Sequence, residues 1–215
     1  MILIDNVDVY GWESAIRGMR NPMNSWDKSD TVYGTYWGEI DNHKCFDSDG
    51  FCIGKNDLEL MKKLVGAGTD HSKFMRMINV TLDITAPLYW WKEFDTYKVG
   101  TVRNSCSTMH KIHERCFELS DFSHEHLTEF SSRCLNNTVG VLNEYRQEYL
   151  RTKDKTYWWQ LIQLLPSSYN QRATVQLNYQ VLRTVYWSRR NHKLDEWVEF
   201  CKWVKTLPYS ELIIM

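Results

Sequence analysis

The sequence predicts a single α+β domain. The chain has 215 residues, of which 43% are hydrophobic and 25% are charged, so it is long enough for one sizeable core and too short to require two. Its segments follow the order strand, helix, strand, helix and then mostly helix. Because neither an internal repeat nor a low-complexity linker divides the chain, we expect one domain over residues 1–215.

The first predicted elements are a strand and a helix. Apolar residues alternate along residues 2–10, and the alternation slips at Asn6, which predicts a bulge or an early end. A short helix over residues 12–19 ends before Asn21-Pro22, because a residue that precedes proline avoids the helical region. Residues 25–54 are rich in Asp, Asn, Ser and Gly and predict a loop insertion.

A second helix and the clearest strand follow. Asn56 is the predicted N-cap of an amphipathic helix over residues 57–65. Residues 74–84 are predicted to be a strand, since apolar and polar residues alternate up to Ile84. Pro87 fits the first turn of a helix through the aromatic segment that follows.

The second half of the chain is predicted to be mostly helical. Ser123 is the expected cap of a long helix over about residues 124–150, with apolar positions at Leu127, Phe130, Cys134, Val141, Leu142 and Tyr145. Shorter helices are expected over residues 157–164, from Asn178 to Arg189, and over about residues 194–207, with a strand over residues 173–177.

Charge and cysteine content limit the function classes. The chain has 26 basic and 27 acidic residues without a Lys/Arg cluster, so we expect no nucleic-acid binding, whereas a few arginines still suffice for a small anionic ligand. The six cysteines form no CxxC pair and no zinc-finger spacing. With no signal-peptide pattern and no membrane-length apolar run, we expect a cytoplasmic protein with reduced thiols and no membrane contact.

The stretch from Ala86 to His110 is the main candidate site. An aromatic segment is followed by a run of hydroxyl and amide side chains, which suits a pocket for a flat ligand with polar edges; the alternative is a helix start followed by a polar loop. Cys106 is a candidate nucleophile with His71 or His110 as its base, or else a packed thiol. His110 and His113 have a spacing that could ligate a metal on a helix, but without a nearby carboxylate triad we predict no metal site.

Two segments carry a resemblance to a known family. The first is His71, the strand that follows it, Ala86-Pro87 and the aromatic helix. The second is Leu165-Pro166 followed by Tyr169, Asn178, Leu182, Arg189 and Glu196. Their order and spacing resemble those of the flavin-dependent thymidylate synthases, which methylate dUMP using FAD, NADPH and methylenetetrahydrofolate. The resemblance implies that family's α+β fold, with a mixed or antiparallel sheet, and a homotetramer with ligand sites between subunits.

The family signature itself is largely rewritten. It reads Arg-His-Arg-x-x-Ser-x-x-Glu-x-Ser-x-Arg, and its residues fall in order on Thr96, Tyr97, Lys98, Thr101, Asn104, Cys106 and Thr108. Hydroxyls and amides therefore persist while most of the charge is lost. Lys98 replaces a bidentate guanidinium with a point charge, and Arg103 could restore one cation from a neighbouring position.

The resemblance implies roles for individual residues. FAD contacts are expected from His71, Thr96, Tyr97, Lys98, Asn104 and Asn178. Contacts to a pyrimidine nucleotide are expected from Thr101, Arg103, Ser105, Ser107, Thr108 and Arg189, and catalytic roles from Cys106 and Arg189. Simpler interpretations are a loop-capping residue for His71, a plain helix N-cap for Asn178 and a solvated helix-end cation for Arg189.

Two other functions remain open. A non-catalytic relative would keep the fold, with or without a nucleotide pocket, and serve as a binding or structural protein, since fold does not determine function. Alternatively, an enzyme on the same fold would modify a different pyrimidine with Cys106 as its nucleophile.

Overall fold

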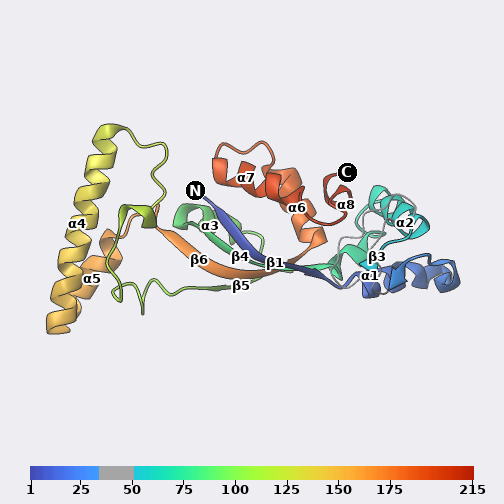
Figure 1. The fold of residues 1–215 in the computed structure, drawn as a ribbon, viewed down its shortest axis with the longest axis horizontal. Coiled ribbons are helices and arrows are strands. Elements are labelled where there is room, and N and C mark those ends of the chain that lie inside the picture. The colour runs from blue at the N-terminus through green and yellow to red at the C-terminus, as the bar shows by residue number, and fades with distance from the viewer. Residues whose placement is uncertain (34–50) are drawn as a thin grey trace.

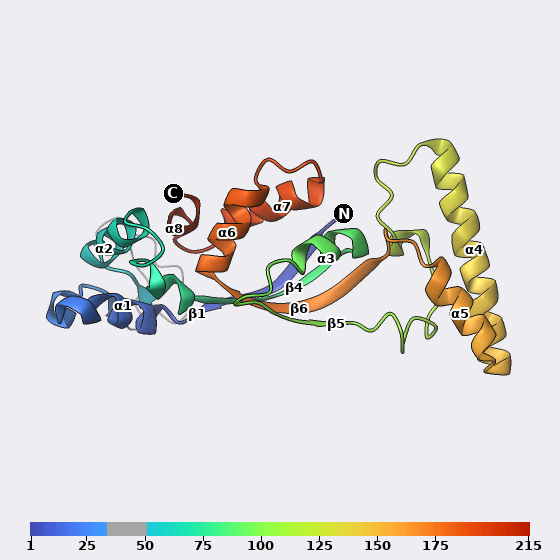
Figure 2. The same cartoon turned by 180° about the vertical axis from the view of Figure 1, so that it is seen from behind.

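The structure is a computed structural model that describes residues 1–33 and 51–215. Its centre is a four-stranded antiparallel sheet in the order β1 (Leu3–Tyr10), β4 (Asn79–Pro87), β6 (Asn170–Asn178) and β5 (Val102–Ser105). The predicted α+β class and antiparallel sheet are thus confirmed. In the views of Figures 1 and 2, the described helices of the central region lie on one face of this sheet, and the molecule is elongated along the strands.

The two faces of the sheet differ in chemistry. Apolar residues of β4 and β6, such as Leu82 and Val175, are buried beneath α3 (Leu88–Phe94), α6 (Tyr179–Arg189) and α7 (Asp195–Val204). The opposite face carries polar side chains at alternate positions, including Asp83, Arg172 and Thr174, which hydrogen-bond to one another. Because side chains alternate along a strand, this pattern identifies the helix-covered face and the open face.

The predicted irregularity in the first strand is confirmed. The pairing of β1 with β4 shifts register between Asp5 and Asp8, and Asn6 adopts a positive φ of 51°. Asparagine tolerates this conformation better than most residues. Asn6 also donates a hydrogen bond of 2.8 Å to the Asp83 carboxylate on the open face.

The predicted second helix is present, but its cap was predicted wrongly. α2 spans Lys55–Gly66 and begins after Gly54, so Asn56 lies inside the helix. The Asp30 carboxylate instead accepts hydrogen bonds from the backbone N–H groups of Asn56 (2.9 Å) and Asp57 (3.1 Å). Because Asp30 lies far from α2 in the sequence, the residues next to the helix start do not reveal this cap.

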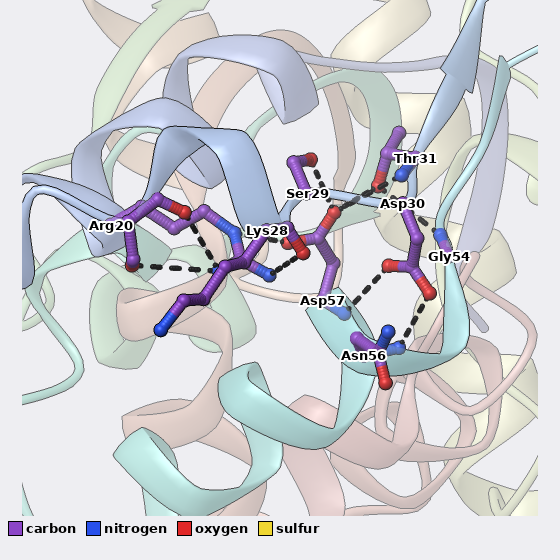
Figure 3. Close-up of polar contacts among 9 residues, drawn as sticks. Arg20, Lys28, Ser29, Asp30, Thr31, Gly54, Asn56 and Asp57 are labelled. Carbon is purple, nitrogen blue, oxygen red and sulfur yellow. Dashed lines mark hydrogen bonds and ion pairs between the residues drawn. The ribbon is translucent and has the colours of Figure 1, made fainter.

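A buried ion pair joins this helix to the first one, α1 (Trp12–Arg20) (Figure 3). Arg20 donates to the Asp57 carboxylate at 2.7 Å and also to the backbone carbonyls of Ser25 and Lys28. Asp57 further accepts hydrogen bonds from Ser29 and Thr31. The described ends of the predicted 25–54 insertion are therefore ordered, and they pair as β2 (Val32–Tyr33) and β3 (Phe51–Cys52), while residues 34–50 lie outside the described residues.

The strand predicted over residues 74–84 starts later and ends later. Lys73–Arg76 forms a 3₁₀ turn, and β4 runs from Asn79 to Pro87. Phe74 and Met75 are buried, so their apolar character reflects core packing rather than strand pairing. Pro87 precedes α3 as its N-cap instead of lying in its first turn.

The second half of the chain contains the expected helices with altered ends. α4 spans Glu129–Thr152 and is capped by Thr128, which accepts a hydrogen bond from the Ser131 N–H; the Ser123 cap was wrong. Ser123 is buried and donates to the Asn170 side chain instead. α5 (Lys155–Leu164), α6 and α7 were predicted, whereas the short helix α8 (Glu211–Ile214) and the 3₁₀ turns Asn21–Met23, Trp26–Lys28 and Leu119–Asp121 were not.

Two hydrophobic cores stabilise the molecule. The main core lies between the sheet and its helices and contains the fully buried rings of Trp90, Trp197 and Phe200. A smaller core lies under α4 and α5 and includes Leu142 and Leu161. Among the apolar positions predicted for the long helix, only Leu142 is fully buried, while Leu127, Phe130, Cys134 and Val141 are exposed. In the described part of the chain, no helix combines the length and apolar character needed to cross a membrane.

Candidate functional site

Part of the region expected to carry the signature is an edge strand, β5, although the sequence indicated neither helix nor strand there. Asn104 lies in this strand, whereas Thr96, Tyr97, Lys98 and Thr101 precede it and Cys106 and Thr108 follow it. In β5, Arg103 pairs with Val175, and Asn104 pairs with Thr174. Since Val175 is buried beneath the helices, Arg103 and Ser105 face the helix-covered side, and Asn104 faces the open side. The residues expected to bind nucleotide and flavin therefore alternate between the two faces.

Arg103 is held against the aromatic helix. Its guanidinium carbon lies 4.7 Å from the centre of the Trp91 ring, and its Nη2 lies 3.4 Å from the Asp95 carboxylate. Its Nη1 is buried without a hydrogen-bond partner among the described residues, as is the Thr101 hydroxyl. Arg103 is therefore not a free cation, and its one unpaired donor is closed off from solvent.

A first pocket, which we call the Cys106 pocket, lies where β6 begins. It is a cavity of about 480 Å³ whose lining includes Cys106, Ser107 and Thr108, with Asn170, Gln171 and Arg172 of β6. The Cys106 backbone is fixed on both sides, since its N–H donates to the Arg172 carbonyl (2.9 Å) and its carbonyl accepts from the Gln171 side chain (2.6 Å). The pocket therefore presents hydroxyls, amides and a thiol on a rigid strand end.

The cations of the Cys106 pocket are paired with carboxylates. Arg115 makes a bidentate ion pair with Asp121, and Lys111 pairs with Glu114. Arg172 contacts Asp5 and Asp83 on the open face of the sheet. Hydrogen bonds from Thr174, Asn6 and Arg172 hold the pKa of Asp83 well below its usual range, and burial raises the pKa of Tyr169 in the pocket lining.

The base proposed for Cys106 is not in place. Within the described residues, no histidine makes a hydrogen bond with the Cys106 sulfur; His110 instead donates its backbone N–H to the Ser107 hydroxyl at 3.0 Å. His110 and His113 lie in a series of turns, not on the helix that would place two histidines at this spacing around one metal ion. No group of three His, Cys, Asp or Glu side chains that could hold a metal ion occurs in the described part of the chain.

A second pocket, the Asn178 pocket, lies where β6 ends and α6 begins. It is a cavity of about 570 Å³ whose lining includes Thr96, Tyr97, Gly100, Asn178 and Arg76. Asn178 is a helix N-cap, because its side-chain oxygen accepts a hydrogen bond of 3.0 Å from the Val181 N–H. Its side-chain nitrogen makes no hydrogen bond to a described residue, so it keeps a donor for a ligand.

Gly100 lets the chain approach Asn178 closely. Its φ is +79°, and a Cβ at this position would lie 3.1 Å from both the Asn178 side-chain nitrogen and the Val181 side chain. A larger residue would be strained and would crowd the cap. His71 and Lys98 line neither pocket, but the neighbouring Ser72 makes a hydrogen bond of 3.2 Å with Gln180, another lining residue of the Asn178 pocket.

Arg189 is neither a free ligand-binding group nor a solvated cation. It donates to the Tyr97 hydroxyl and to the Glu93 carboxylate, both at 2.8 Å, and its guanidinium carbon lies 4.9 Å from the Trp197 ring centre. Trp197 also donates to Glu93. Glu93 was not predicted as a site residue. Its one signal in the sequence is its position a helical turn after Tyr89 and Trp90 in an otherwise aromatic segment.

The two pockets are well separated within one chain. β6 has nine residues, and its first residue, Asn170, lines one pocket while its last, Asn178, lines the other. At a rise of about 3.3 Å per residue, the two ends lie roughly 26 Å apart. A single copy therefore does not unite the two pockets. Among the predicted site residues, one pocket is lined by Cys106, Ser107 and Thr108, the other by Thr96, Tyr97 and Asn178, and neither by His71, Lys98, Thr101, Arg103, Asn104, Ser105 and Arg189.

Comparison with known proteins identifies the fold. No family model and no curated protein matches the sequence. A flavin-dependent thymidylate synthase, ThyX, from Helicobacter pylori, solved with FAD and dUMP, matches with a TM-score of 0.66 at 16% identity, over 99% of this chain and 97% of that one. A UMP/dUMP methylase, PolB, from Streptomyces cacaoi, solved with 5-Br dUMP, matches with a TM-score of 0.62 at 14% identity, over 100% and 94% of the two chains. The chain therefore has the fold of the flavin-dependent thymidylate synthases, as its sequence predicted.

Proposed function

We propose that this protein binds FAD and a pyrimidine nucleotide and methylates dUMP or a related nucleotide, with NADPH and methylenetetrahydrofolate as co-substrates. The observation that carries the proposal is a fold shared over nearly the whole chain with proteins that were solved with dUMP or its bromo analogue. The two pockets add support, because each gathers residues assigned to ligand binding on sequence grounds alone.

The Asn178 pocket suits a flavin in its donor chemistry. A flavin ring has carbonyl and nitrogen acceptors at its edge, and the pocket offers the Asn178 amide and the Tyr97 hydroxyl as donors. The Thr96 hydroxyl already donates to the Glu93 backbone carbonyl at 2.8 Å, so it offers a ligand only an acceptor. When bound, the flavin supplies hydride and one-carbon transfer, and the protein supplies orientation and electrostatics. Tyr97 is fixed for this role, because its hydroxyl accepts a hydrogen bond from Arg189 and its ring lies against Trp197.

The Cys106 pocket is the proposed nucleotide site. Ser107 and Thr108 offer hydroxyls, and Arg115 and Arg172 offer guanidinium groups that match phosphate geometry. In this proposal the nucleotide competes with Asp121 and Asp5 for these cations. A nucleotide with a dianionic phosphate can replace these carboxylates as the partner of the arginines, whereas an uncharged nucleoside cannot.

A homotetramer would unite the two pockets. Since one chain holds them at opposite ends of β6, the Asn178 pocket of one copy would face the Cys106 pocket of another. The arm formed by α4 and α5 (Figure 1) offers an apolar surface for assembly, because Phe130 is 69% exposed and Trp159 is 43% exposed. We further propose a single domain over residues 1–215 and a cytoplasmic location, which suits the five free cysteines of the described residues.

The test is a binding and turnover experiment on the full chain. Purified protein is titrated with FAD by absorbance and with dUMP by calorimetry, and dTMP formation is measured with all co-substrates present. We expect saturable binding of both ligands and production of dTMP. Absence of flavin binding together with absence of dUMP binding would refute the proposal.

Two alternatives are separated by the same assay. The loss of the Arg-His-Arg positions and the engagement of Arg189 by Glu93 favour a non-catalytic nucleotide-binding protein, which would bind ligands without turnover. A Cys106 nucleophile acting on another pyrimidine would require the thiol. A Cys106→Ala variant that keeps full activity would eliminate that possibility, and a Cys134→Ala variant, which alters an exposed thiol outside both pockets, is its control.

A further inference from the structure

The Asn178 pocket lacks the positive charge that the Arg-His-Arg positions of the family signature would supply. The Arg-His-Arg positions hold Thr96, Tyr97 and Lys98. Thr96 and Tyr97 line the pocket, but Lys98 does not. None of the three residues at the Arg-His-Arg positions therefore brings a positive charge to the lining of the Asn178 pocket.

Another arginine enters the same cavity from a different segment. Arg76 ends the 3₁₀ turn Lys73–Arg76, ahead of β4, and lines the Asn178 pocket together with Thr96 and Tyr97. Its side chain is exposed, and it makes no hydrogen bond or ion pair with any residue in the described part of the chain. Arg103 and Arg189, the other arginines near this segment, are paired with Asp95 and Glu93.

We propose that Arg76 supplies the guanidinium that the rewritten signature lacks, and that it binds a phosphate group of the ligand held in the Asn178 pocket. A guanidinium offers two parallel N–H donors to a phosphate, which a lysine cannot match. Because Arg76 has no carboxylate partner to give up within the described residues, this contact displaces no existing ion pair. The inference rests on the proposed function and names the ligand chemistry of the same site.

The test compares ligands with and without phosphate. Riboflavin, FMN, FAD, deoxyuridine and dUMP are titrated into the wild-type chain, Arg76→Gln, Arg76→Lys and the control Arg17→Gln, which alters an exposed arginine outside both pockets. The ligands form a flavin series (riboflavin, FMN and FAD) and a nucleotide series (deoxyuridine and dUMP). In one of these series, we expect Arg76→Gln to bind the phosphate-bearing ligands about tenfold more weakly than the wild type does, as for a lost charged hydrogen bond. The affinities for riboflavin and deoxyuridine, which carry no phosphate, should not change. A loss confined to FMN and FAD assigns the phosphate to the flavin, and a loss confined to dUMP assigns it to the nucleotide.

The outcomes separate this inference from the proposed function. Arg76→Lys should recover part of the affinity, and Arg17→Gln should match the wild type. Equal affinities of Arg76→Gln and the wild type for all ligands would overturn the inference alone, as would an equal loss for riboflavin and FMN. Failure of the wild-type chain to bind any of the five ligands would overturn the proposed function and this inference together. Thermal melting of each variant verifies folding, which an exposed side chain should not affect.

Discussion

Replacing Asp57 with alanine should destabilise the region where α1, α2 and residues 25–33 meet. Asp57 is fully buried and accepts hydrogen bonds from Arg20, Ser29 and Thr31 (Figure 3). The substitution leaves the Arg20 guanidinium, itself 4% exposed, without a counterion. Breaking a buried ion pair in this way costs about 3–5 kcal/mol.

The structure places the expected loss near the lower end of that range. Arg20 keeps its hydrogen bonds to the carbonyls of Ser25 (3.1 Å) and Lys28 (2.9 Å), so its charge remains partly solvated. The hydroxyls of Ser29 and Thr31 lose an acceptor and can turn toward water, because their contacts with Asp57 are only partly buried. We therefore expect the free energy of unfolding to fall by about 3 kcal/mol.

Urea unfolding followed by tryptophan fluorescence measures this loss. Asp27→Ala is the matched control, since Asp27 is exposed on the neighbouring turn and should change stability by less than about 0.5 kcal/mol. The double variant Arg20→Met/Asp57→Leu removes both charges and should be more stable than Asp57→Ala. A loss below about 1 kcal/mol for Asp57→Ala, or a double variant no more stable than it, would refute the argument.

Three further outcomes are expected. Asn178→Ala removes the cap of α6 and should cost about 1 kcal/mol, seen as a fall in Tm of about 2–4 °C. Leu142→Ala, in the smaller core, should cost about 2–5 kcal/mol in urea unfolding, whereas Phe130→Ala on the exposed side of the same helix should cost far less in the monomer. Burial would raise the pKa of Asp57, but hydrogen bonds from Ser29, Thr31 and Arg20 together lower it below its ordinary value. Its stabilising contribution should therefore be complete above the unfolded pKa of about 3.9 and be lost as the pH falls through the folded pKa, so the stability gap between wild type and Asp57→Ala should narrow as the pH falls below about 4.

Local patterns predicted much of the fold. The bulge at Asn6, the aromatic helix after Pro87 and the Asn178 cap were all visible in a few adjacent residues, because alternation and capping act over one or two turns. The caps at Asn56 and Ser123 were wrong for the opposite reason. The N-terminus of α2 is capped by the Asp30 carboxylate, which comes from a distant segment, and the Ser123 hydroxyl donates to the Asn170 side chain. Tertiary contacts thus override the local capping preference.

The site was harder to predict because its arrangement depends on strand pairing. Once residues 102–105 are known to be a strand, alternation places Arg103 and Asn104 on opposite faces, but this run of polar residues gives no periodic apolar signal. Arg76 and Thr96 likewise come from separate segments, and they line one pocket together with Asn178 and residues of α6 only in the folded chain. Neither pattern can be read from a single segment.

The length of β6 has a genetic consequence. Its two ends line different pockets, so a substitution that damages one pocket leaves the other intact in the same polypeptide. If working sites combine halves from different copies, two inactive variants, one altered at each end, should restore partial activity when they are co-expressed in one cell. The two ends of a single strand would then behave as separate complementation groups encoded by one gene.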